Sequence, residues 1–383
     1  MDKNRLEKLS NSLQLNLALI LLFGVIMVFS SSYMYARENF GTPTHFLIKQ
    51  IIFIISGLGL AYVLSKSRIN FWYKRAYVIN SFFIVLLFLT LVPGIGVMMK
   101  GSERWINLRF MLLQPGEFVK FSLILCAIKY FENFNLYARK EKLLFSLNLI
   151  LPLLGFILQP DFGTFAISFT IIFFVAFLSH FPRKYFYSSV IIGFVSVMGI
   201  LFAAPYRVKR ILVFLDPWKD PKNAGFQIIQ SFLAFAHGSI SGQGLGNSNE
   251  KLFYLPEAYN DFIFSVVGEE LGFLGVAFGV GLFIVFIFLG FRIALSLPSR
   301  LAALIVSAVT FSIGFQAFLN MGVVLGLLPT KGLNLPLISY GGSSMLANLA
   351  ALGLMFAALN IKNNENENNQ IKIDPRKKKS IFE

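Results

Sequence analysis

Hydrophobic residues gather in long continuous runs along this chain, separated by short polar segments. Each run is roughly 20 residues long, which is the length of helix that crosses the hydrocarbon core of a bilayer. The pattern therefore predicts an all-α, polytopic integral membrane protein with about ten transmembrane helices. The predicted spans lie near residues 13–36, 44–64, 75–93, 112–131, 143–159, 161–180, 185–205, 260–291, 299–326 and 337–361.

Lysine and arginine are concentrated in every second connecting segment, which predicts the orientation of the spans. An even number of spans places both termini on one side, and the basic segments belong to the cytoplasm. The chain then divides into a cytoplasmic N-terminus (1–12), a transmembrane domain (13–361) and a disordered basic cytoplasmic tail (362–383). A large extracytoplasmic loop, 206–259, separates spans seven and eight. The first run is too long for a signal peptide and is expected to remain as a span.

Composition and charge narrow the function classes further. The chain is 56% hydrophobic and carries a net charge of +15, which the positive-inside rule explains without a nucleic-acid partner. The single cysteine, Cys126, rules out an internal disulfide, and three widely spaced histidines do not predict a metal site. The sequence has no G-x-x-x-x-G-K-[ST] loop, so no nucleotide cofactor is expected.

Acidic residues within or at the ends of the spans are the first candidates for function, because ionisable groups are costly in lipid. Asp261 opens a long apolar span directly after a polar loop, where it could take a proton from a sugar hydroxyl at headgroup level. Glu117 and Lys120 are three residues apart on one helical face, so they can neutralise each other. For this pair a structural ion pair and a functional role both remain open.

Three other acids are expected to be structural. Asp161 begins a span, where a carboxylate can cap a helix. Glu269 and Glu270 follow Asp261 by eight and nine residues, so a straight helix would place them about 12–13 Å deeper. At that depth they are expected to pack against polar groups of neighbouring helices.

Basic residues near the predicted outer face are candidates for binding a diphosphate, because arginine matches phosphate oxygens. Arg104 and Arg207 favour this role, together with Arg210. Ordinary anchoring to lipid headgroups is an equal alternative for Arg109 and Lys209.

Seven motifs in order resemble the SEDS family of cell-wall polymerases, which comprises the FtsW, RodA and SpoVE branches. They are "GSERWINL", "QPGEFVK", "QPDFGT", "GFQIIQS", "GQGLGNS", "LPEAYNDFIFSVVGEELGF" and "QAFLNMGVVLGLLPTKGLNLPLISYGGSS". The match is closest to the division branch, FtsW, on "LPTKGL" with Lys331 and on "GEELG". Gly116, Arg109 and the "AYND" lead-in to the aspartate depart from the usual family pattern.

The resemblance implies a peptidoglycan glycosyltransferase that polymerises lipid II at the outer face of the cytoplasmic membrane during septal wall synthesis. It implies that Asp261 is the catalytic residue, and that Arg104, Glu117 and Lys120 line or support a cavity open to the outer leaflet. We count Lys331, Arg207 and Arg210 with the substrate-binding residues. A divalent cation, Mg²⁺ or Mn²⁺, held by Asp261 is left open as a cofactor.

The expected partners are lipid II, a glycan linked to a polyprenyl diphosphate, a class B penicillin-binding protein and other divisome proteins at the septum. Alternatives are a RodA-like elongation polymerase, a lipid II flippase, and a scaffold that only recruits the transpeptidase. Alternating access would favour a charged site near the midplane and repeated halves, and the sequence shows no convincing repeat.

Overall fold

The computed structural model describes residues 3–99, 102–109, 111–202, 212–222, 225–248, 258–330 and 332–360. Within these residues the long helices are α1 (Lys3–Phe40), α2 (His45–Lys66), α4 (Ala76–Leu89), α5 (Pro115–Glu132), α6 (Arg139–Leu158), α7 (Phe162–Leu178), α8 (Arg183–Phe202), α10 (Phe226–Gly238), α11 (Ile263–Ala294), α12 (Arg300–Val324) and α13 (Gly342–Leu359). The short helices are α3 (Ile69–Lys74), η1 (Phe134–Leu136) and η2 (Pro217–Lys219).

Each of the ten predicted spans coincides with one helix, and α10 lies in the predicted loop between spans seven and eight. Six of the helices are long and apolar enough by themselves to cross a membrane: α1, α2, α6, α11, α12 and α13. Helices α4 and α7 are apolar but shorter. The fold is therefore that of a polytopic helical membrane protein, as the sequence predicted.

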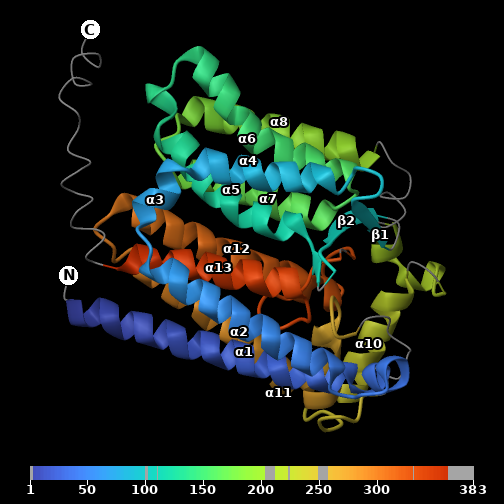
Figure 1. The fold of residues 1–383 in the computed structure, drawn as a ribbon. Helices are drawn as coiled ribbons and strands as arrows, with labels where there is room; N and C mark the ends of the chain where they lie inside the picture. The colour runs from blue at the N-terminus through green and yellow to red at the C-terminus, as the bar shows by residue number, and fades with distance from the viewer. Residues whose placement is uncertain are drawn as a thin grey trace.

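The long helices lie side by side in two groups (Figure 1). One group contains α4 to α8, and the other contains α1, α2, α11, α12 and α13; α5 and α7 join the groups by packing against α12, and α5 also packs against α13. Helix α1 begins and α13 ends at the same end of the bundle (Figure 1). The opposite end, which we call the strand-bearing end, carries α10 and three short strands (Figure 1).

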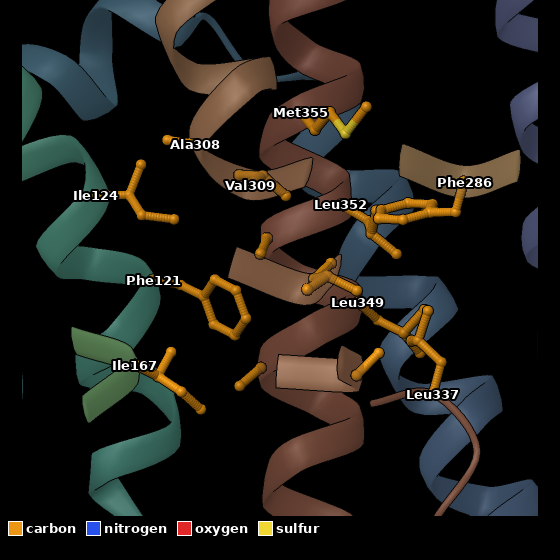
Figure 2. Close-up of a cluster of buried hydrophobic side chains, with 14 of the residues drawn as sticks. Phe121, Ile124, Ile167, Phe286, Ala308, Val309, Leu337, Leu349, Leu352 and Met355 are labelled. Atoms are coloured by element: carbon orange, nitrogen blue, oxygen red, sulfur yellow. The ribbon is translucent and has the colours of Figure 1, made fainter. Parts of the chain in front are cut away.

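The apolar core lies where the two groups meet. Figure 2 shows Phe121 and Ile124 of α5, Val309 of α12, and Leu349 and Leu352 of α13 within one cluster of buried side chains. Such packing between helices holds a membrane protein together, because lipid removes the hydrophobic drive that acts in water. Polar groups inserted at this junction are consequently cut off from solvent.

The structure departs from the predicted all-α fold in one connecting segment. The strands β1 (Gly96–Met99), β2 (Ser102–Asn107) and β3 (Leu112–Leu113) form a small antiparallel sheet in the order β1-β2-β3 between α4 and α5. The short segment contains β-branched and aromatic residues such as Val97, Trp105 and Ile106, which favour strands. Hydropathy over span-length windows cannot detect such short strands.

Helix α11 is not the straight span that its continuous apolar sequence predicted. Gly272 interrupts it with φ 63° and ψ −161°, a left-handed backbone that favours glycine. At the break, the backbone of Gly242 lies so close that a Cβ on Gly272 would come within 2.4 Å of the Gly242 nitrogen. The first piece of α11, Ile263 to Leu271, therefore takes its own direction.

Candidate active site at the strand-bearing end

Asp261 lies two residues before α11, and the residue is partly exposed. Three successive carbonyls around it accept hydrogen bonds from other segments. Tyr259 O accepts from Tyr340 N (3.0 Å), and Asn260 O accepts from Ser339 Oγ (2.6 Å). Asp261 O accepts from the Asn320 side-chain nitrogen Nδ2 (2.8 Å). The backbone that carries the carboxylate is thus fixed residue by residue.

The loop of residues 332–341, between α12 and α13, forms the other side of this site. Its apolar side chains Leu333, Leu335, Leu337 and Ile338 are buried, so the loop is part of the packed interior. A Cβ added to Gly332 would lie 3.3 Å from Asp261 Oδ2, which places the loop backbone against the carboxylate. Loop 332–341 therefore shapes the surroundings of Asp261 directly.

Two amide side chains of α12, one helical turn apart, anchor this loop. Asn320 Nδ2 donates to Leu333 O (2.6 Å) as well as to Asp261 O, and Gln316 Nε2 donates to Asn334 O (2.9 Å). Both side chains are almost fully buried. Neither was selected from the sequence as a site residue. The sequence does contain a signal for them: two amide residues four positions apart in an apolar span lie on one face of the helix, where buried polar side chains indicate a function.

The ion pair predicted between Glu117 and Lys120 is present, with Glu117 Oε2 and Lys120 Nζ 2.9 Å apart. Lys120 has no exposed surface and also donates from Nζ to Gln316 Oε1 (2.7 Å). The ammonium is therefore held by α5 and α12 together. This geometry connects Lys120 to loop 332–341 through Gln316, and it favours a supporting role over direct contact with substrate.

Arg104 of β2 and Asp161 come together at the turn between α6 and α7. Asp161 caps α7 as predicted, because its Oδ1 accepts from Thr164 N (3.2 Å) and its Oδ2 from Thr164 Oγ1 (2.9 Å). Arg104 Nη2 donates to Pro160 O (2.6 Å), and its Nη1 lies 3.8 Å from Asp161 Oδ1. The guanidinium is part-exposed and thus joins the small sheet to the start of α7 while keeping a face toward solvent.

Glu269 and Glu270 are fully buried and bound to polar groups, as their predicted structural role requires. Glu270 Oε2 accepts from Ser30 Oγ of α1 (2.5 Å). Glu269 Oε2 accepts from Ser248 Oγ, and its Oε1 lies 3.9 Å from His237 Nδ1 of α10.

The predicted greater depth of this pair stays a prediction. Glu269 contacts His237 of α10 and Ser248, which belong to the segment predicted to lie outside the membrane. Two further hydrogen bonds attach the same segment to the backbone of α11: Gln243 N donates to Glu269 O (2.9 Å), and Gly244 N donates to Glu270 O (3.0 Å). The break at Gly272 follows both glutamates, so the helical rise that separates them from the start of α11 is kept, and the break changes only the direction of this first piece relative to the rest of the helix.

Four candidate binding residues lie outside the described residues. They are Arg207, Lys209, Arg210 and Lys331.

A divalent cation at Asp261 would need donors of more than one kind. Among the described residues, no group of three or more His, Cys, Asp or Glu side chains could hold a metal ion. Mg²⁺ is commonly held by one or two carboxylates together with water and substrate phosphates. Asp261 fits that pattern as the single protein carboxylate.

Comparison with known proteins decides the family. The sequence model of the FtsW/RodA/SpoVE family, described as cell cycle proteins, matches residues 11–366. The chain belongs to this family. The resemblance to SEDS proteins is therefore confirmed, and it covers the whole helical bundle.

Individual FtsW/RodA/SpoVE relatives are similar over nearly their full lengths. A probable peptidoglycan glycosyltransferase FtsW of Geobacter metallireducens is 39% identical over 343 residues, covering 87% of this chain and 90% of the relative. One of Thioalkalivibrio sulfidiphilus is 39% identical over 362 residues, covering 91% and 89%.

Solved structures of the family share the fold. A chain from a structure described as "Structural coordination of polymerization and crosslinking by a peptidoglycan synthase complex" has a TM-score of 0.74 at 28% identity, covering 91% of this chain and 97% of that one. The rod shape determining protein RodA of Thermus thermophilus has a TM-score of 0.66 at 25% identity, covering 91% and 95%.

Proposed function

We propose that this chain is a peptidoglycan glycosyltransferase of the FtsW type, which polymerises lipid II into glycan strands for the septal cell wall. The observation that carries the proposal is the placement of Asp261: a part-exposed acidic residue at one end of the bundle, on a backbone fixed at three successive carbonyls. A fixed carboxylate beside solvent suits proton transfer from a bound substrate. The relatives named FtsW supply the substrate class.

In the proposed reaction, the Asp261 carboxylate accepts the proton of the GlcNAc 4-hydroxyl of the acceptor. The hydroxyl oxygen attacks the anomeric carbon of the donor, and the bond from that carbon to the lipid diphosphate breaks. The leaving diphosphate carries the negative charge away, stabilised by Arg104 together with Arg207, Arg210 and Lys331. A divalent cation bound by Asp261 would add positive charge at the same diphosphate.

The proposed setting follows from the distribution of charge. Both termini and the basic connecting segments face the cytoplasm, so the strand-bearing end with Asp261 faces outward, toward lipid II. A class B penicillin-binding protein is the proposed partner, since the similar structure of a peptidoglycan synthase complex is described as coordinating polymerization and crosslinking. Activity is expected to be weak without this partner.

Replacing Asp261 with asparagine tests the proposal. The Asp261→Asn protein, purified with its cognate transpeptidase and given lipid II, should lose at least about 100-fold in the rate of glycan formation, because general bases contribute roughly 10²–10⁴-fold. Glu141→Gln is the matched control: Glu141 is an acid that caps the start of α6 by accepting from Ala138 N (2.8 Å), at the end opposite the strands. It should polymerise at the wild-type rate.

Two outcomes would reject the proposal. Wild-type polymerisation by Asp261→Asn would exclude this carboxylate as the base. Lipid II crossing vesicle membranes without any polymer from the wild-type complex would favour transport.

A further inference from the structure

The backbone at Asp261 lies just before α11, so hydrogen bonds from elsewhere must fix it. Two of the three donors, Tyr340 N and Ser339 Oγ, come from loop 332–341, and the third is Asn320 Nδ2 of α12. The loop donors can orient Asp261 only if the loop itself is held. The anchoring of the loop therefore bears on the direction of the carboxylate.

Asn320 performs both tasks with one group. Its Nδ2 donates to Asp261 O (2.8 Å) and to Leu333 O (2.6 Å), which uses both hydrogens of the amide. The side chain is 2% exposed, so water cannot replace these bonds. One buried amide therefore ties Asp261 to loop 332–341, in addition to the two direct hydrogen bonds that the loop donates to residues 259 and 260.

Gln316 extends the same support to the buried ion pair. Its Nε2 donates to Asn334 O (2.9 Å), while its Oε1 accepts from Lys120 Nζ (2.7 Å). Lys120 is itself neutralised by Glu117. An uninterrupted series of polar contacts therefore leads from α5 through α12 to the loop that lies against Asp261.

We infer that Asn320 and Gln316 are positioning residues for Asp261, and that they fix the direction of its carboxylate without touching the substrate. This inference rests on the proposed glycosyltransferase function. Small errors in the placement of a reacting group cost large factors in rate, about 10²-fold for 1 Å. Substrate affinity should depend little on either amide, because both are buried beneath the loop.

The decisive variant is Asn320→Leu, which keeps the number and branching of the side-chain heavy atoms but cannot donate a hydrogen bond. We expect kcat for lipid II polymerisation by the complex with the transpeptidase to fall by roughly 10–100-fold, with KM changed by less than about threefold. Gln316→Met should act in the same direction with a smaller effect, because Asn320 still holds Asp261 directly. Asn320→Asp should also lower kcat, because an ionised carboxylate cannot donate to the carbonyl oxygens of Asp261 and Leu333.

Asn16→Leu is the matched control for loss of a buried amide. Asn16 of α1 is 5% exposed and donates from Nδ2 to Leu282 O (3.2 Å), so it also joins a helix to α11, but beyond the break at Gly272. Its replacement should lower the unfolding temperature to a similar extent and leave kcat per folded molecule unchanged.

The outcomes separate this inference from the proposed function. If Asp261→Asn is inactive while Asn320→Leu keeps the wild-type kcat, or loses activity only in proportion to folded protein as Asn16→Leu does, the positioning role is wrong. A rise in KM at constant kcat would likewise overturn it, because that pattern indicates lost substrate binding. An active Asp261→Asn protein would instead reject the proposed function.

Discussion

Helices α5 and α12 are joined by polar contacts at two places that differ in access to water. Near the strand-bearing end, Lys120 contacts Gln316 (2.7 Å) with no exposed surface on the lysine. At the opposite end, Arg300 binds Glu132 through Nε (2.9 Å) and Nη2 (3.2 Å), and the arginine side chain is 47% exposed. The same two helices thus carry one buried junction and one solvated junction.

The difference shows what each junction can do. A buried charge must be fully partnered, because its desolvation is costly, and the partners are therefore fixed in place. An exposed pair is screened by water and has alternatives in solvent. Only the buried junction continues, through Gln316, into loop 332–341 beside Asp261. Variants that break one junction or the other should consequently differ in stability, in activity and in their response to salt.

Breaking the buried junction should have the largest effect. The variant Lys120→Met leaves Glu117 buried without its cation, which typically costs about 3–5 kcal/mol of unfolding free energy. Glycan synthesis should also fall, because the support of loop 332–341 through Gln316 is lost. Thermal unfolding in one fixed detergent and polymerisation of lipid II measure the two effects.

The double variant Glu117→Gln/Lys120→Met provides the control for the buried charge. It removes both members of the pair, so most of the lost stability should return. Activity should recover less, since Gln316 still lacks its donor. A Lys120→Met protein as stable as wild type would show that the buried junction contributes nothing to stability.

Breaking the exposed junction should have a much smaller effect. Glu132→Gln keeps an acceptor for Arg300 and for His180 N but removes the charge. We expect a loss below about 1 kcal/mol in unfolding free energy and an unchanged polymerisation rate. A loss of activity comparable with that of Lys120→Met would contradict the distinction between the two junctions.

The sequence predicted the bundle well because a membrane span requires a long apolar run. All ten predicted spans are helices, and the contacts predicted within one turn, Glu117 with Lys120 and Asp161 with its own helix start, are present. These features depend on short separations along the chain. Helical periodicity is enough to predict them.

The features that were missed depend on long separations. Gln316 meets Lys120 across 196 residues, and the glycine-rich sequence around Gly242 permits a close backbone approach without specifying that Gly272 is its partner. The same holds for Asn320, which is 59 residues from Asp261. Sequence could show that α12 carries two amides on one face, but not which loop they hold.

The response of the two junctions to salt should be the smallest of the three predicted effects. Raising ionic strength from about 0.1 M to 1 M shortens the Debye length from about 10 Å to 3 Å, which weakens exposed pairs and barely changes buried ones. The difference in unfolding temperature between wild type and Glu132→Gln should therefore shrink at high salt, whereas the difference between wild type and Lys120→Met should persist. Measuring both variants in one detergent cancels the general effect of salt on the micelle. Equal shrinkage of the two differences would mean that water reaches Lys120, and the comparison drawn from its burial would then fail.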